Sequence, residues 1–289
     1  MVAWMIYHRD NAVNNKQYID FYLEEGAKLG IVIKLLLVED IEFGVRDGRW
    51  ILTHQNVEPD KPDFAICRAI YPLLNKHLEY MGIPVFNNSF VAEICNDKAK
   101  TYQFLARTGI KMVDSSFYHN AQIRKVIDAV QSPTVIKAVE GHGGSQVFLI
   151  PGNQAMDGSD YSEVIQKLGN SDVVVQPLTG TRNQDLRVYV IGTTIITAVL
   201  RTAKEGFKSN FSLGGEVKLY TLSNAEIDIV NRIIQEFDFG LVGIDFIIGE
   251  EGELIFNEIE DVVGSRMLYQ CSDINIVEKY LSFIKGKLD

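Results

Sequence analysis

The segment that most constrains the fold runs from Leu241 to Glu260 and reads LVGIDFIIGEEGELIFNEIE. Two runs rich in Ile, Val, Leu and Phe flank a polar turn at 249–252, which predicts two strands joined as a hairpin. Asp245 interrupts the first run, and Glu258 and Glu260 close the second. Because strand side chains alternate between faces, Glu258 and Glu260 share one face. Antiparallel pairing about the turn would bring Asp245 opposite the neighbourhood of Glu258.

Three carboxylates on one patch of sheet repel one another unless a cation lies between them. Hard oxygen ligands in this arrangement suit Mg²⁺, which takes its remaining ligands from water and substrate phosphates. The alternative is an amphipathic hairpin with a solvated acidic face. The residues of the hairpin alone leave both interpretations open.

Length and charge limit the class of protein. A chain of 289 residues exceeds one typical core and predicts two or three lobes. The formal net charge of −10 argues against binding of nucleic acid but permits a local basic pocket. The three cysteines form no CxxC pair, so neither a disulfide framework nor a zinc site is indicated. The N-terminus resembles no signal peptide and no apolar run reaches membrane length, so we expect a cytoplasmic protein without a membrane partner.

Strand and helix signals alternate over the first 95 residues, which predicts a small doubly wound sheet. It begins with a strand at 2–8, a polar loop at 11–15 and a helix at 16–29. A new helix that starts at Asn96 marks the main boundary. Residues 96–178 are typical of a compact α+β lobe. Long strands, a helix, the acidic hairpin and a terminal helix follow in 179–289.

A second candidate site lies in TVIKAVEGHGGSQVFLI, residues 134–150. Lys137 lies inside an apolar strand, where a lysine is costly unless it meets an anion. The glycines that follow would let backbone N–H groups approach phosphate oxygens closely. The loop is not a Walker A motif, because no Gly-Lys-Ser/Thr opens a helix. The alternative is an ordinary glycine-rich hairpin with Lys137 in solvent. His142, in this loop, is the one histidine of interest.

Two more segments carry polar residues between strands. In 173–192 a buried strand runs into Gln176–Leu178, whose backbone groups would suit an adenine edge. Asp185 and Arg187 then share one face of the next strand, with a cross-strand ion pair as the alternative interpretation. In 201–215 a local basic cluster favours an anion site, and a solvated loop is the alternative.

In this order, the segments resemble the ATP-grasp superfamily, and most closely its RimK-like ligases. The resemblance covers about 96–267 and more loosely the N-terminal lobe. It rests on NDK at 96–98, VIKAVEGHGG, VVVQPL, DLR, RTAKEGFKSNFSLGG, and GIDF with NEIE. It implies an α/β fold of α+β lobes. These are an N-terminal Rossmann-like pre-ATP-grasp domain (1–95), a central lid subdomain (96–178) and a C-terminal catalytic subdomain (179–289).

The resemblance also implies roles for single residues. The implied ATP-binding residues are Lys98, Lys137, Glu140, Gly143, Gly144, Ser145, Gln176, Pro177, Leu178, Asp185, Lys208, Ser209 and Asn210. Asp245, Glu258 and Glu260 match the ligands of Mg²⁺, for which Mn²⁺ is a possible substitute. The implied catalytic residues are Arg187, Arg201 and Asn210, with the two arginines steering the γ-phosphate or an acyl phosphate.

The sequence departs from the family pattern after the hairpin. Family members carry Glu-x-Asn followed by Ser-Pro-Gly, whereas this chain has Glu258–Ile259–Glu260 and then DVVGSR at 261–266. Glu260 keeps an oxygen ligand, so the resemblance still implies metal binding. The Ser-Pro-Gly segment helps to shape the acceptor pocket in relatives, so its replacement affects the expected substrate and not the use of nucleotide. Arg68, which follows the buried strand DFAIC, and Arg266 are predicted to hold the substrate carboxylate.

The predicted activity is ATP-dependent formation of an amide bond between a carboxylate and an amine. ATP would phosphorylate the acid, and an amino acid, peptide or protein tail would attack the acyl phosphate, releasing ADP and phosphate. This chemistry needs positioning and charge neutralisation more than a general base. Two alternatives are a nucleotide-binding sensor or scaffold without turnover, and an ATP-dependent kinase. The motifs specify neither the acid nor the amine, and a homo-oligomer is possible.

Overall fold

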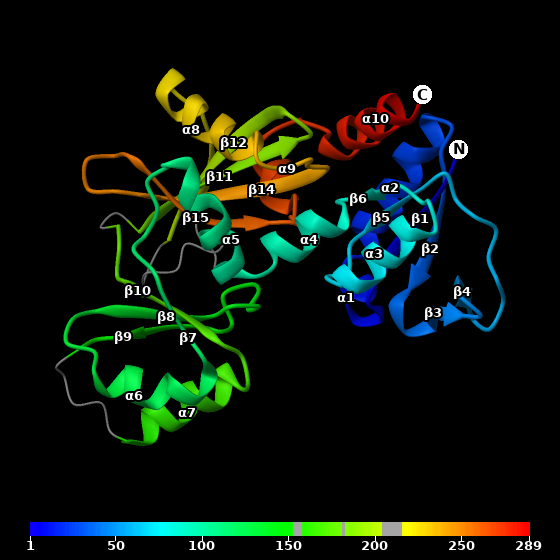
Figure 1. Ribbon diagram of the computed structural model, residues 1–289. Helices are drawn as coiled ribbons and strands as arrows, with labels where there is room; N and C mark the ends of the chain where they lie inside the picture. Colours follow the sequence, from blue (N-terminus) through cyan, green and yellow to red (C-terminus); the bar gives the residue numbers. More distant parts are fainter. Residues whose placement is uncertain (153–157, 181–182, 204–215) are drawn as a thin grey trace.

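The computed structural model describes residues 1–152, 158–180, 183–203 and 216–289, which form three lobes, each built on its own main sheet (Figure 1). The N-terminal lobe has a parallel sheet in the order β2-β1-β5-β6. Its elements are β1 (Val2–Tyr7), α1 (Arg9–Asn14), α2 (Lys16–Lys28), β2 (Val32–Leu37), β3 (Ile41–Arg46), β4 (Arg49–His54), β5 (Phe64–Cys67), α3 (Pro72–Tyr80) and β6 (Val85–Phe86). Strands β3 and β4 form a hairpin about the turn at Asp47–Gly48.

One prediction for this lobe is wrong, because the expected polar loop at 11–15 forms most of helix α1. The local signal is weak, since His8 at the N-cap makes no side-chain capping hydrogen bond. Ala12 is nevertheless buried in the same core cluster as Tyr22 of α2. Tertiary packing therefore stabilises a short helix that local propensity does not predict.

The lid lobe is an antiparallel sheet in the order β7-β10-β8-β9, with two helices on one face (Figure 1). Its elements are β7 (Ser116–Tyr118), α6 (Ile123–Asp128), β8 (Thr134–Ala138), β9 (Val147–Ile150), α7 (Gly158–Leu168) and β10 (Val173–Pro177). Ile136 and Ala138 of β8 pack in the core beneath α6 and α7. Because side chains alternate, Val135 and Lys137 lie on the other face.

The C-terminal lobe is a five-stranded antiparallel sheet in the order β13-β12-β11-β14-β15. Its elements are β11 (Gln184–Ile191), β12 (Thr194–Thr202), β13 (Glu216–Tyr220), α8 (Asn224–Ile234), β14 (Leu241–Ile248), β15 (Leu254–Glu260), α9 (Arg266–Cys271) and α10 (Ile276–Leu288). Helix α8 starts at a capping box made by Ser223 and Glu226. In Figure 1, α8 covers the face of this sheet that is turned away from the lid. Strand β13 and helix α9 were not among the predicted elements.

Helices α4 (Ser89–Cys95) and α5 (Lys98–Leu105) precede the lid in sequence but pack on the C-terminal sheet. Tyr102 and Leu105 of α5 share one core cluster with Phe246 and Phe256 of the hairpin. Short 3₁₀ turns at 38–40, 106–108 and 120–122 complete the described secondary structure. The start of α5, where Lys98 lies, is thereby held against β15.

Candidate active site

The acidic hairpin has the predicted register, with Asp245 of β14 directly opposite Glu258 of β15. The next pair is Phe246 with Phe256, so Asn257 is an extra residue in β15 that forms a β-bulge. The bulge changes the alternation of β15, so Phe256 packs in the core while Glu258 faces the lid side. One carboxylate oxygen from each of Asp245, Glu258 and Glu260 lies within 4.8 Å of the others.

A chain of ion pairs that includes Asp245 and Glu260 crosses the sheet. Arg187 donates from Nε to Asp245 Oδ1 at 2.7 Å and from Nη2 to Oδ2 at 2.6 Å. Arg201 donates from Nη2 to Asp245 Oδ2 and to Asp185 Oδ2, both at 2.7 Å. Arg187 Nη2 also lies 2.7 Å from Glu260 Oε1. We call Asp185, Arg201, Asp245, Arg187 and Glu260 the arginine–carboxylate ladder.

Asp185 and Arg187 form cross-strand ion pairs, but with neighbouring strands and not with each other. Asp185 pairs with Arg201, its neighbour on β12, and Arg187 pairs with Asp245, its neighbour on β14. Burial opposes ionisation of Asp245, but the two guanidinium groups hold its pKa below the ordinary value. Burial raises the pKa of Asp185 to about 6, against the opposing effect of Arg201.

The two arginines balance only part of the negative charge. Burial, together with the neighbouring Asp245 and Glu258 carboxylates, raises the pKa of Glu260 even though Arg187 opposes the shift. Glu258 and Glu260 line the cavity described below, so both can offer oxygens to an ion there. Asp245 Oδ1 accepts one hydrogen bond and keeps a further acceptor direction. An oxygen-only donor set with excess negative charge fits Mg²⁺.

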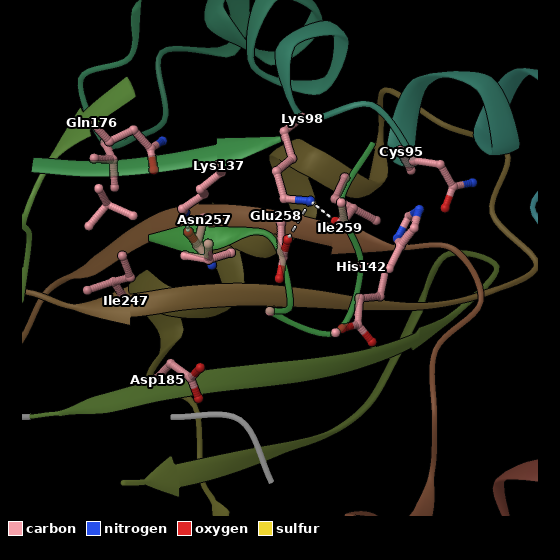
Figure 2. A pocket seen from close by; sticks show the side chains of 18 of the residues that line it. Cys95, Lys98, Lys137, His142, Gln176, Asp185, Ile247, Asn257, Glu258 and Ile259 are labelled. Atoms are coloured by element: carbon pink, nitrogen blue, oxygen red, sulfur yellow. Dashed lines mark hydrogen bonds and ion pairs between the residues drawn. The ribbon is translucent and has the colours of Figure 1, made fainter. Parts of the chain in front are cut away.

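Two lysines reach the same strand from the lid side (Figure 2). Lys98 donates to the carbonyl oxygen of Gly141, and its Nζ lies 3.5 Å from Glu258 Oε2. Lys137 Nζ donates to Asn257 Oδ1 at 2.8 Å. Each lysine is only 9% exposed. Burial lowers the pKa of Lys137 to about 8, while the charge of Glu258 opposes the shift and that of Lys98 adds to it. This is the response expected of a buried cation that has no carboxylate in ion-pair contact.

A cavity of about 470 Å³ opens between the lid, the C-terminal sheet and the edge of the N-terminal lobe. The predicted site residues that line it are Arg68, Lys98, Lys137, Gly143, Gly144, Gln176, Pro177, Leu178, Asp185, Glu258 and Glu260. Segments from all three lobes, up to 192 residues apart in sequence, therefore meet at one cavity. His142, singled out in the glycine loop, lies there as well.

The other predicted residues that the structure describes do not line this cavity. Arg187, Arg201 and Asp245 are buried behind its wall as the middle of the ladder. Glu140 and Ser145 are exposed, and Arg266 is exposed at the first residue of α9. Of the two arginines expected to hold a substrate carboxylate, Arg68 alone reaches the cavity. Lys208, Ser209 and Asn210 lie outside the described residues.

The segment expected to hold adenine uses some of its polar groups within the lid. Gln176 Nε2 donates to Ser115 Oγ at 2.8 Å, and the Leu178 N–H donates to the carbonyl oxygen of Pro133 at 3.0 Å. The side chains of Val135, Leu178 and Ile247 also line the cavity at this end. They form an apolar region suited to a flat ring.

Sequence reasoning missed several residues of the cavity wall. Asn257, the partner of Lys137, lies in the NEIE motif, but alternation alone would place it on the opposite face from Glu258. Asn96 and Asp261 also line the wall, and Asn96 Nδ2 donates to Asp261 Oδ2 at 2.9 Å. The asparagine of NDK was the available signal for this pair.

Residues 95–284 match the family described as RimK-like ATP-grasp domain. The chain belongs to the RimK-like ATP-grasp family. The match includes the lid, the acidic hairpin and both lysines. Members of this family are ATP-dependent ligases, and the predicted α/β ATP-grasp fold and ligase activity are both confirmed.

Relatives of known sequence extend the match over the whole chain. The uncharacterized protein MG011 of Mycoplasma genitalium is 27% identical over 301 residues, covering 99% of this chain and 96% of that protein. A probable alpha-L-glutamate ligase of Legionella pneumophila is 29% identical over 215 residues, which cover 73% of this chain and 70% of the relative. The similarity to MG011 thus extends beyond the RimK-like region to nearly the full length of both chains.

Solved structures share the three-lobed fold. D-cycloserine synthetase DcsG superposes with a TM-score of 0.73 at 12% identity, covering 100% of both chains. D-alanyl-alanine synthetase A of Vibrio cholerae gives a TM-score of 0.71 at 15% identity, covering 100% of this chain and 98% of the other. At these identities the likeness concerns the fold. In the described part of this RimK-like protein, no helix is long and apolar enough to cross a membrane.

Proposed function

We propose that this RimK-like ligase activates a carboxylate as an acyl phosphate and joins it to the amine of an amino acid or a peptide. The observation that most directly supports this proposal is that two buried lysines and the carboxylates of β15 line a single cavity. Cations facing carboxylates across a space of this size suit a triphosphate with its divalent ion. The glutamate ligase relative and the D-alanyl-alanine synthetase fold support amino-acid substrates.

The proposed roles follow from position. Lys98 and Lys137 bind phosphate oxygens, and the backbone N–H groups of Gly143 and Gly144 approach them from the lid. Glu258 and Glu260 hold magnesium, which supplies neutralisation of phosphate charge when bound. The remaining predicted ligand, Asp245, also keeps the two ladder arginines oriented beneath the site.

The adenine ring is proposed to bind in the apolar region near Leu178, and the ribose close to Asp185. The ring would lie between Val135 of the lid and Ile247 of β14. Because these two residues belong to different lobes, nucleotide binding would hold the lid against the C-terminal sheet.

Phosphate release measured against a matrix of amino acids and dipeptides, with ATP and Mg²⁺, tests this proposal. We expect release that depends on an acid together with an amine, and hydroxylamine should trap the acyl phosphate. Nucleotide binding without release across the matrix would favour a sensor or scaffold. Release that resists hydroxylamine and leaves a stable phosphorylated product would favour a kinase.

Lys137→Ala and Glu258→Gln should each abolish this turnover while the circular dichroism spectrum stays unchanged. Glu253→Gln is a matched control, because Glu253 lies in the same hairpin but pairs with exposed Lys111 and does not line the cavity. It should keep wild-type activity. Near-normal turnover in either of the first two variants would count against the assignment.

A further inference from the structure

Three arginines of the described chain are buried, and their electrostatic surroundings differ. Arg187 and Arg201, exposed by 5% and 4%, each pair with carboxylates in the ladder. Arg68 is 8% exposed and has no carboxylate within ion-pair distance among the described residues. A buried guanidinium without a counterion carries an unbalanced desolvation cost.

The partners of Arg68 are all neutral. Its Nε donates to Tyr7 Oη at 3.3 Å, and its Nη2 donates to the carbonyl oxygen of Val263 at 3.0 Å. The guanidinium also lies over the Tyr18 ring, 5.3 Å from the centroid. These hydrogen bonds use two of five guanidinium donors. The remaining donors are available to a planar anion.

Neighbouring ionisable groups do not supply the missing charge. Burial raises the pKa of Tyr22 and of Tyr280, so both phenols stay neutral. The Asp261 carboxylate feels the charge of Arg68, but its oxygens accept hydrogen bonds from Asn87 Nδ2 at 2.5 Å and Asn96 Nδ2 at 2.9 Å. Asp261 is therefore satisfied by amides and forms no ion pair with the arginine.

Arg68 follows β5 and lines the cavity at the edge of the N-terminal lobe. Ile70 and Val262 line the cavity with it, and its partner Val263 belongs to the segment that follows β15. The nucleotide motifs supply none of these residues. The wall thus combines one unpaired cation with aliphatic side chains.

We propose that Arg68 binds a substrate carboxylate at this wall, and that Ile70 and Val262 contact the aliphatic part of the same molecule. The inference rests on the ligase function proposed above and deepens it. It makes one substrate an aliphatic acid that is recognised by the N-terminal lobe. A bidentate guanidinium–carboxylate contact would supply the charge that the folded protein does not.

The test compares sodium glutarate with neutral glutaramide as probes, in the full-length protein at constant ionic strength. Glutarate should raise the Tm of the wild type by about 2–4 °C when present at tenfold its Kd, and glutaramide should not. Arg68→Met should abolish the shift, and Arg68→Lys should restore part of it. Arg107→Met, which removes an exposed arginine paired with Glu236, should respond like the wild type.

Either an equal shift in Arg68→Met or no shift in the wild type overturns the proposal. Binding of MgADP is measured in parallel by calorimetry, and its Kd should change less than twofold in Arg68→Met. If the wild-type protein does not bind MgADP, the proposed function is refuted instead. The two readouts therefore separate failure of the carboxylate site from failure of the nucleotide site.

Discussion

The cations around the cavity fall into two groups. Arg187 and Arg201 are each paired with carboxylates inside the C-terminal sheet. Lys137 and Arg68 are equally buried, but their hydrogen-bond partners are an amide, a phenol and a carbonyl. Both arginines of the first group have carboxylates within ion-pair distance, whereas Lys137 and Arg68 have none among the described residues. Among these four residues, the two cations without a carboxylate partner line the cavity, and the two arginines with carboxylate partners lie behind its wall.

The largest effect should come from breaking the paired group. Asp245→Asn leaves two buried guanidinium groups without their shared carboxylate, so we expect the free energy of unfolding to fall by about 3–5 kcal/mol. Urea denaturation measures the loss. Asp238→Asn is the matched control, because it removes an exposed partner of Lys287 and should cost at most about 1 kcal/mol. Equal losses of unfolding free energy in the two variants would mean that the buried ion pairs of the ladder stabilise the protein no more than an exposed ion pair does.

An intermediate effect is expected from the protonation of Lys137, whose pKa of about 8 reflects its burial. Phosphate affinity requires the charged amine, so the Kd for ADP should rise about tenfold between pH 7 and pH 9. Arginine stays charged over this range, so Lys137→Arg should show a flat profile. Calorimetry at several pH values measures the Kd for ADP in the wild type and in Lys137→Arg. The same pH dependence in both proteins would exclude Lys137 as the titrating group.

The same pKa has a consequence for the protein without nucleotide. Between pH 8 and the ordinary lysine pKa the unfolded chain binds more protons than the folded protein. The free energy of unfolding contributed by Lys137 should therefore increase as pH rises through this window. Urea denaturation of the wild type and Lys137→Met at pH 8 and pH 10 isolates the contribution, which should vanish in the variant. A decrease with pH that is specific to the wild type would have the wrong sign.

The smallest effect should come from removing an unpaired cation. Arg68→Met gives up two neutral hydrogen bonds but also relieves the burial of an uncompensated charge, so stability should change by no more than about 1 kcal/mol. Arg187→Met, which strips a partner from Asp245, should cost several times as much. A loss in Arg68→Met as large as that in Arg187→Met would remove the distinction between the two groups.

The hairpin shows how far the sequence could predict the site. Alternation and the turn at 249–252 place Asp245 opposite Glu258, and the structure has this register. The bulge at Asn257 has no local signal, so its approach to Lys137 was missed. Phe256, next to the bulge, packs against Tyr102, which lies far along the chain. Local patterns therefore predicted the pairing of the strands but not the irregularity within them.

The surroundings of Arg68 depend on contacts that no local pattern encodes. Its partners Tyr7 and Val263 lie 61 and 195 residues away, so its lack of a carboxylate could be recognised only in the folded protein. The same limit applied to Arg187 and Arg201, whose partners lie on neighbouring strands. Residue type indicated a charged site at each position. The fold decided which charges were compensated.

The central claim is that the lysines and carboxylates of the cavity bind a magnesium nucleotide. Titration calorimetry with ATP, in the presence of Mg²⁺ or of EDTA, tests it most directly. We expect binding with Mg²⁺ that weakens at least tenfold in EDTA, and loss of this magnesium dependence in Glu258→Gln. Absence of ATP binding, or equal binding with and without Mg²⁺ in the wild-type protein, would contradict the account.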